Sequence, residues 1–241
     1  VSSQNDFGKM GEPPTHPALL DWLAVEFRDG GQSFKKLHKL IVTSAVYRQQ
    51  STHSAANATL DSSNQYLWRM HRRRLSAEEI RDSILMVSGK LNREMGGPGF
   101  FDFVLEKATH SPHYQYHKHD PNDAKTHRRS IYRFIVRSQP QPFLTTMDCA
   151  DPSISVPTRS ETLTALQALA MFNNPFVIAM SEHFADSART TSAPEAYLLS
   201  HSFSRPPSDR ELRRIANFAK ANGLESAARA LFNSNEFLFV E

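Results

Sequence analysis

Residues 76–91 read SAEEIRDSILMVSGKL, and this stretch decides the fold class. Ser76 followed by Glu79 forms a capping box, in which each side chain accepts a hydrogen bond from the backbone N–H of the other residue at a helix start. Apolar residues then recur at the spacing of one helix face, at Ile80, Ile84, Val87 and Leu91. The stretch therefore predicts an amphipathic helix, and the glycine-rich run at 96–99 ends it.

The same kinds of signal predict helices on both sides of this stretch. Before it, one helix opens at Thr15-His16-Pro17, with Thr15 as its cap, and ends at Gly30-Gly31, while a second helix starts after Ser33. The short linker between these two indicates an antiparallel hairpin. Residues 51–63 lack periodicity and predict a loop.

Helices are predicted again in the second half of the chain. The first of them follows Ser160 and is defined by apolar residues at Leu163, Leu166, Leu169 and Ala170. Others are predicted over residues 176–184, over 208–223, where Ser208 and Glu211 form another capping box, and over 227–232.

One segment departs from the helical pattern. Residues 130–137 read SIYRFIVR, alternate in part and are rich in residues that favour strands. A strand needs a partner, which residues 100–105 or 237–240 would supply. We therefore predict a mainly α protein, a single helical domain over residues 1–241 with antiparallel helix hairpins and one small β element around 130–137.

Composition excludes several classes of protein. No apolar run approaches the roughly 18 residues of a membrane span, so we predict no span in this chain. Basic and acidic residues number 15 and 13 in residues 1–120 and 13 and 12 in residues 121–241, and this balance argues against a nucleic-acid partner. Cys149 is the single cysteine, so the chain holds no internal disulfide and no CxxCH haem attachment. We expect no cofactor within it, apart from a metal ion on histidines.

Histidines gather in one irregular stretch. The chain has 11 histidines, and five of them lie there: His110, His113, His117, His119 and His127. In an extended backbone His117 and His119 point to the same side, and Asp120 adds an oxygen, so these three are the candidate metal ligands. His113 is a candidate acid–base group, because imidazole titrates near neutral pH. The alternative is a solvated polar loop with no such role.

A second group of polar residues lies between the predicted strand and the helix after Ser160. Asp148, Asp151 and Arg159 are candidate catalytic residues, because paired carboxylates can carry acid–base chemistry when folding brings them to a suitable separation. The alternative is turn and cap chemistry, in which Asp151-Pro152 starts a turn. The sequence leaves both interpretations open.

Several of these segments also match a known pattern in order. They are Asp6-Phe7-Gly8, Thr15-His16-Pro17, Leu20-Asp21-Trp22-Leu23-Ala24, Arg73-Arg74-Leu75-Ser76-Ala77-Glu78-Glu79, Gly96-Gly97-Pro98, Arg128-Arg129-Ser130-Ile131-Tyr132, Asp151-Pro152, Asn173-Asn174, Arg205-Pro206-Pro207-Ser208 and Leu231-Phe232-Asn233-Ser234-Asn235-Glu236-Phe237. Together they resemble the planctomycete PSD-type domain from end to end. This is a domain of unknown function at the C-terminal end of large multidomain proteins that often carry planctomycete cytochrome c-like domains.

The resemblance implies a context for this chain. Such a domain is usually preceded by one further helix, so we expect Val1 to begin a fragment that lacks its first helix. The resemblance also implies an extracytoplasmic protein, periplasmic or secreted, with haem in companion domains only. No catalytic residues are known for the family, and none are carried over to this chain.

Two functions follow from the residues and the resemblance. The preferred one is an interaction or scaffold module that docks beside neighbouring domains of the same polypeptide, including cytochrome c-like modules. The alternative is a catalytic domain, a hydrolase or oxidoreductase that acts on polysaccharide and uses the His110–His127 stretch with or without a metal. The catalytic alternative predicts a pocket in which His117 and His119 meet Asp148 or Asp151.

Overall fold

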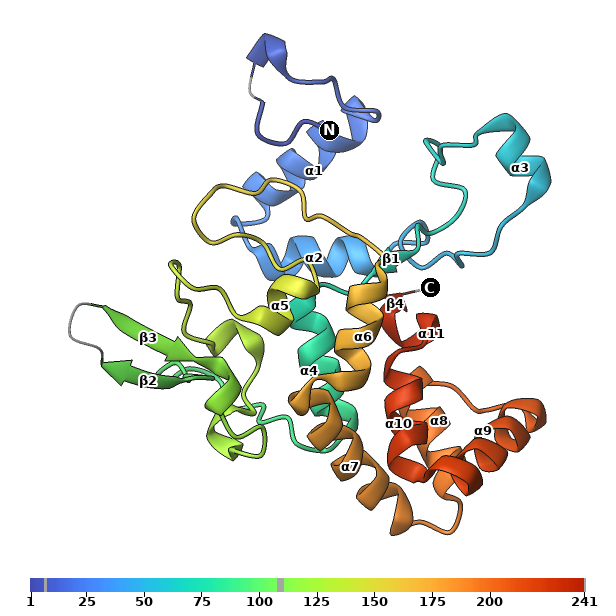
Figure 1. The fold of residues 1–241 in the computed structure, drawn as a ribbon. Coiled ribbons are helices and arrows are strands. Elements are labelled where there is room, and N and C mark those ends of the chain that lie inside the picture. The colour runs from blue at the N-terminus through green and yellow to red at the C-terminus, as the bar shows by residue number, and fades with distance from the viewer. Residues whose placement is uncertain (7, 108–110, 241) are drawn as a thin grey trace. The chain divides into compact units, whose positions relative to one another are not determined.

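The computed structural model describes residues 1–6, 8–107 and 111–240, and within them the protein is mainly α, as predicted. Eleven α-helices and two sheets of two strands each make up the regular structure of the described residues, together with short 3₁₀ segments (Figure 1). The chain divides into two compact units, residues 1–73 and residues 74–240. That a single domain covers residues 1–241 stays a prediction. Among the described residues, no helix is both long and apolar enough to cross a bilayer.

Unit 1 contains the predicted pair of N-terminal helices. They are α1 (Pro17–Asp29) and α2 (Phe34–Val42), which follow the short 3₁₀ segment η1 (Gly8–Met10). The rings of Phe27 and Phe34 lie 5.0 Å apart where the two helices meet. As predicted, Ser33 caps α2, by accepting a hydrogen bond from the backbone N–H of Lys36. The predicted cap of α1 is wrong, because its N-cap is His16 and no side chain caps that helix.

The predicted loop at 51–63 contains a short helix. This is α3 (Ala55–Leu60), which Ser54 caps by accepting a hydrogen bond from the backbone N–H of Asn57. After it, Asp61 accepts hydrogen bonds from the backbone N–H groups of Gln65 and Tyr66. Periodicity missed the helix because six residues are fewer than two turns, too short to repeat a pattern.

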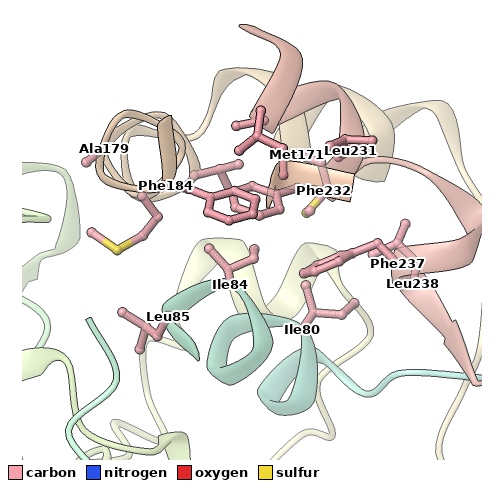
Figure 2. Close-up of a cluster of buried hydrophobic side chains, with 14 of the residues drawn as sticks. Ile80, Ile84, Leu85, Met171, Ala179, Phe184, Leu231, Phe232, Phe237 and Leu238 are labelled. Carbon is pink, nitrogen blue, oxygen red and sulfur yellow. The ribbon is translucent and has the colours of Figure 1, made fainter. Parts of the chain in front are cut away.

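Unit 2 is built around the helix that the capping box predicts. This helix is α4 (Ala77–Val87), and both reciprocal hydrogen bonds between Ser76 and Glu79 are present. It packs against α7 (Pro175–Arg189), and α7 in turn packs against α10 (Leu224–Phe232) (Figure 1). Figure 2 shows Ile80 and Ile84 of α4 directed toward Phe232 of α10, and all three side chains are fully buried.

The remaining helices of unit 2 surround this core. They are α5 (Pro142–Thr146), α6 (Ala165–Asn173), α8 (Pro194–Phe203), α9 (Asp209–Asn222) and α11 (Asn235–Leu238). The sequence predicted α6, α7, α9 and α10 but not α5, α8 or α11. The α8 helix begins at a proline and has no side-chain cap.

The predicted start of α6 is wrong. The helix starts at a capping box between Thr164 and Gln167 rather than after Ser160. Its buried residues are Gln167 and Met171, whereas the leucines that defined the prediction are exposed. A run with apolar residues on several faces does not fix which face is buried, so the packing against α7 and α10 decides it.

The predicted strand at 130–137 is absent from the structure. Residues Ser130–Tyr132 form a 3₁₀ segment, η4, and Arg133 makes only an isolated parallel bridge with Phe100. The reason is a side chain from α4, because the carboxylate of Asp82 accepts hydrogen bonds from both the backbone N–H and the hydroxyl of Ser130. That contact takes a backbone donor that a sheet would need.

Strands form elsewhere. β2 (Val104–Lys107) and β3 (Pro112–Gln115) form an antiparallel pair in which Val104 faces Gln115 (Figure 1). The second sheet joins β1 (Arg73–Arg74) and β4 (Phe239–Val240), so residues 239–240 do pair, though not with residues 130–137. The chain between β3 and α5 carries two further 3₁₀ segments, η2 (Tyr116–Lys118) and η3 (Ala124–Thr126).

An arginine joined to two glutamates ties the end of α8 to α9 and α11. Arg205 donates from Nε to Glu236 at 2.5 Å and from an amino group to Glu211 at 2.6 Å. The Arg205 side chain, followed by hydrogen bonds from Ser208, lowers the pKa of Glu211. A depressed carboxylate pKa contributes stability that is fully present above the pKa of the unfolded chain and is lost as the pH falls through the folded value.

We therefore predict that protonation of Glu211 contributes to the loss of stability in acid. The melting temperature of the natural chain is expected to fall more steeply below about pH 4.3 than that of Glu211→Gln, because the variant has no such proton to take up. Glu182→Gln, on the exposed side of α7, is the control and should keep the natural slope. Identical slopes for the natural chain and Glu211→Gln would contradict the prediction.

Candidate functional site

A small pocket in unit 2 lies where α4 meets the segment between β3 and α5. Its volume is about 250 Å³. Its polar lining comes from six parts of the chain: Arg81 of α4, Asp102, the segment with Tyr116, His117 and His119, Thr126 of η3, the start of α5 at Gln141, and the start of α7 at Asn174. Phe143 and Phe176 give it an apolar wall. We call this the Asp102 pocket.

Asp102 contributes a buried carboxylate, and one of its oxygens has no hydrogen-bond donor among the described residues. The residue is 8% exposed, and its Oδ1 lies 3.5 Å from a guanidinium nitrogen of Arg133. At that distance the charges attract, but Oδ1 accepts no hydrogen bond from any described residue. A buried carboxylate oxygen without a donor is costly, so it marks a place where a ligand or water can bind.

His119 brings a second open atom to the same pocket. Its Nε2 is buried and has no hydrogen-bond partner among the described residues. Burial lowers the pKa of His119, and the nearby charges of Asp102, Asp123 and Asp120 oppose this only in part. The imidazole is therefore neutral at pH 7, which leaves one ring nitrogen able to accept a proton.

Helix caps orient two of the amides in the pocket wall. The side-chain oxygen of Gln141 accepts a hydrogen bond from the Leu144 N–H at 2.7 Å, and that of Asn174 accepts one from the Phe176 N–H at 2.9 Å. Each amide oxygen is thus used at a helix N-terminus. Within the described part of the chain, neither side-chain NH₂ group donates a hydrogen bond, so both remain available.

Arg81 holds the loops around the pocket in place. It is 6% exposed, and its amino groups donate to the backbone oxygens of Arg128 at 2.9 Å and Thr126 at 2.5 Å. Its guanidinium also lies over the rings of Phe100 and Phe176, at 5.0 and 5.6 Å. Burial lowers the pKa of Arg81, opposed by the charges of Asp82 and Asp102. Arginine remains charged even so, and Arg81 supplies a fixed cation.

The structure places the three predicted metal ligands differently from one another. His117 and His119 both line the Asp102 pocket, although His117 lies within the 3₁₀ segment η2 and His119 directly follows it, rather than both lying in an extended strand. Asp120 does not line it and accepts a hydrogen bond from the Asn122 N–H at 2.9 Å, as in a turn. No group of three metal-ligating side chains is present among the described residues. Metal binding by His117, His119 and Asp120 stays a prediction.

Of the other histidines of the predicted stretch, the two that the structure describes do not line the pocket. His110 lies outside the described residues. His113 is exposed on β3, opposite Glu106. His127 is buried, and its Nε2 lies 2.8 Å from the backbone oxygen of Pro121. An acid–base role for His113 therefore stays a prediction without a geometric partner.

Asp148 belongs to a buried network away from the pocket. Its Oδ2 accepts hydrogen bonds from Arg74 at 2.9 Å, from the Thr162 N–H at 2.8 Å and from Gln167 at 2.9 Å. Burial alone would raise the pKa of Asp148, but the hydrogen bonds from Thr162 and Gln167 lower it below its ordinary value. The carboxylate is thus held charged by an array of donors, as in a structural link.

Asp151 and Arg159 also lie apart from the pocket. Asp151 is exposed and accepts a hydrogen bond from the Ser153 N–H at 2.8 Å, which is turn chemistry. Arg159 pairs with both carboxylate oxygens of Glu78. None of the three residues Asp148, Asp151 and Arg159 lines the pocket, so the expected meeting of His117 and His119 with Asp148 or Asp151 does not occur.

The carboxylate of the pocket is one that the sequence analysis missed. Asp102 lies within the run Phe100-Phe101-Asp102-Phe103, and a single charge among residues that bury themselves needs a partner or a function. That signal was present in the sequence. Arg81 gave no such signal, because on an amphipathic helix an arginine is ordinarily a solvated residue.

Fold and pocket together define a mainly α protein with a small polar pocket built from buried side chains of several elements. Residues 1–219 match PSD1, a family described as protein of unknown function (DUF1553). The chain belongs to this family. No curated protein and no solved structure matches it.

Proposed function

We propose that unit 2 is a ligand-binding domain whose site is the Asp102 pocket, and that His119 exchanges a proton with the bound molecule. One observation carries this proposal: Asp102 Oδ1 and His119 Nε2 are both buried, both lack a hydrogen-bond partner among the described residues, and both belong to one pocket. Buried polar atoms are nearly always paired, so two open ones in one pocket favour a ligand that pairs them.

The proposed chemistry follows from the charges around His119. A neutral imidazole accepts a proton from a ligand hydroxyl or from a water molecule, and the products are an imidazolium and the corresponding alkoxide or hydroxide. The charge of Asp102 favours that cation, since it already acts to raise the pKa of His119. Asp102 thus has two roles, as hydrogen-bond acceptor for the ligand and as the charge that stabilises protonated His119. This proposal is related to the catalytic alternative of the sequence analysis, with Asp102 in the place expected for Asp148 or Asp151.

A thermal-shift screen of the full chain tests the proposal. The probes are small sugars, amino acids and dicarboxylic acids, measured with the natural chain and with Asp102→Asn and His119→Gln. We expect at least one probe to raise the melting temperature of the natural chain and to leave both variants unchanged, because binding stabilises the folded state by mass action. His113→Gln, on exposed β3, is the matched control and should respond like the natural chain. A probe that stabilises all four proteins equally would contradict the site.

The pH dependence of binding gives a separate prediction. Because the pKa of His119 is lowered, the neutral form persists below the ordinary histidine value of about 6.5. Binding that needs neutral His119 is therefore expected to be present at pH 7 and to be lost as the pH falls through the lowered pKa, below about 6.5. Titration of the affinity against pH for the natural chain and His119→Gln measures this. A loss of affinity centred above pH 6.5 would contradict the role of neutral His119.

The interaction module is the second candidate, and a row of exposed apolar side chains supports it. Leu163 and the α6 residues Leu166 and Leu169 are 68%, 64% and 56% exposed. An apolar row of this kind on a helix is typical of a surface that another protein covers. By the resemblance, the partner is a neighbouring domain of the same exported, extracytoplasmic polypeptide, such as a cytochrome c-like module.

The double variant Leu166→Gln, Leu169→Gln tests this surface. It should weaken the association between this chain and the separately expressed neighbouring domain, as measured by size-exclusion chromatography.

A further inference from the structure

We infer that the Asp102 pocket takes a neutral, hydroxyl-rich ring of the size of one sugar unit. The inference rests on the proposed function, because it names the class of molecule that this same site binds. It is drawn from three properties of the lining: its charges, its free donors and acceptors, and its apolar wall.

The charges of the lining are already paired within the protein. Asp102 faces Arg133 at 3.5 Å, and Arg81 faces Asp82 at 3.3 Å. An acidic ligand would meet the buried carboxylate of Asp102, and a cationic ligand would meet Arg81. A charged ligand would also have to give up its hydration in a small site without an unpaired counter-ion to replace it. A neutral molecule meets neither repulsion.

The free hydrogen-bonding groups are of both kinds. Asp102 Oδ1 is an acceptor without a hydrogen-bond donor among the described residues. The NH₂ groups of Gln141 and Asn174 are donors, because their oxygens are taken by the caps of α5 and α7. A hydroxyl group both donates and accepts, so a ligand that carries several hydroxyls can satisfy both kinds of group at once.

The apolar wall and the volume of the pocket indicate the shape and size of the ligand. Phe143 and Phe176, whose ring centroids lie 6.0 Å apart, line the pocket together with their chain neighbours Pro142 and Pro175. The C–H face of a saturated ring packs on such a wall, while its hydroxyls point to the polar side. The volume of about 250 Å³ is below the range of roughly 300–1,000 Å³ that drug-sized molecules occupy. One ring fits this volume better than an oligomer does.

Titration of the full chain with three matched probes tests the inference. The probes are glucose, its acidic counterpart glucuronate and its amino counterpart glucosamine, followed by ligand-observed NMR. We expect glucose to bind about tenfold more tightly than either charged probe, which corresponds to the loss of about one hydrogen bond to a charged group. Binding should be weakened in Asp102→Asn, which replaces the charged acceptor with a neutral amide oxygen.

Two conservative variants separate a donor role from a structural role. Asn174→Asp and Gln141→Glu keep the oxygen that caps each helix, and a negative charge there is favoured by the helix dipole. Both variants replace the NH₂ donor with an acceptor. We expect each to keep the natural melting temperature and to bind glucose about tenfold more weakly.

Each other outcome overturns the inference in a distinguishable way. If glucuronate or glucosamine binds more tightly than glucose and Asp102→Asn abolishes that binding, the ligand class is wrong while the proposed site stands. If glucose binds equally to the natural chain, Asp102→Asn and Asn174→Asp, both the ligand class and the proposed site are wrong. If none of the three probes binds, the inference of a sugar-sized hydroxyl ligand is overturned, and the broader thermal-shift screen decides the proposed function.

Discussion

Phe232→Ala is expected to lower the free energy of unfolding by about 3–5 kcal/mol, the cost of truncating a buried phenylalanine. Phe232 is fully buried in the centre of unit 2, and its ring stacks on that of Phe184 with centroids 5.6 Å apart (Figure 2). The truncation leaves a cavity that the surrounding helices cannot fill without moving, because α10 is held by both α7 and α9. Chemical denaturation of the full chain, followed by circular dichroism, measures this loss.

The control for this experiment is a phenylalanine of the neighbouring helix. Phe218 lies on α9 and is 41% exposed, so Phe218→Ala should cost about 1 kcal/mol or less. Equal losses for the two variants would mean that the packing around Phe232 is not the centre of the core. Phe232→Leu, which keeps most of the buried volume, should fall between the natural chain and Phe232→Ala.

Asp148→Ala is expected to destabilise the protein by about 3 kcal/mol or more, because it leaves the buried charge of Arg74 without its carboxylate. The side chain of Arg74 is 3% exposed, so water cannot replace the lost partner. The substitution also removes the acceptor that ties Thr162 and Gln167 to this network. Denaturant melts of the natural chain and the variant measure the difference.

Two further variants test whether Asp148 is structural or catalytic. Asp148→Asn keeps an acceptor oxygen without the charge, so we expect a smaller loss of stability than in Asp148→Ala. Asp151→Ala removes an exposed turn residue and should change stability by about 0.5 kcal/mol or less. A stable Asp148→Ala variant would contradict the structural assignment and would restore Asp148 as a functional candidate.

The starts of the helices show how much of the fold local sequence signals can predict. Capping boxes at Ser76 and Ser208 predicted α4 and α9 correctly, because the hydrogen bonds that start these helices join residues only three positions apart. The unpredicted α8 has no side-chain cap. The single caps at Ser54 and Gln141 are equally local, but the helices that they start, α3 and α5, were not predicted.

The candidate site could be predicted only in part. His117 and His119 were singled out from their clustering, and both line the Asp102 pocket. The carboxylates predicted to meet them lie away from the pocket. Asp148, for example, pairs with Arg74, which lies 74 residues before it in the chain. The position of Asp102 in the pocket is set by the tertiary fold, because in the sequence its segment is a run of aromatic residues.

The sequence by itself determined the mainly α class and the starts of the helices α2, α4 and α9, and the family follows from its ordered motifs. Only the tertiary structure decided which face of α6 is buried, that residues 130–137 form no strand, and which acid joins His119. The physical reason is the range of the interactions. A cap is satisfied within one turn, whereas burial of a face, or capture of the Ser130 backbone by Asp82, depends on residues that meet only when the chain has folded.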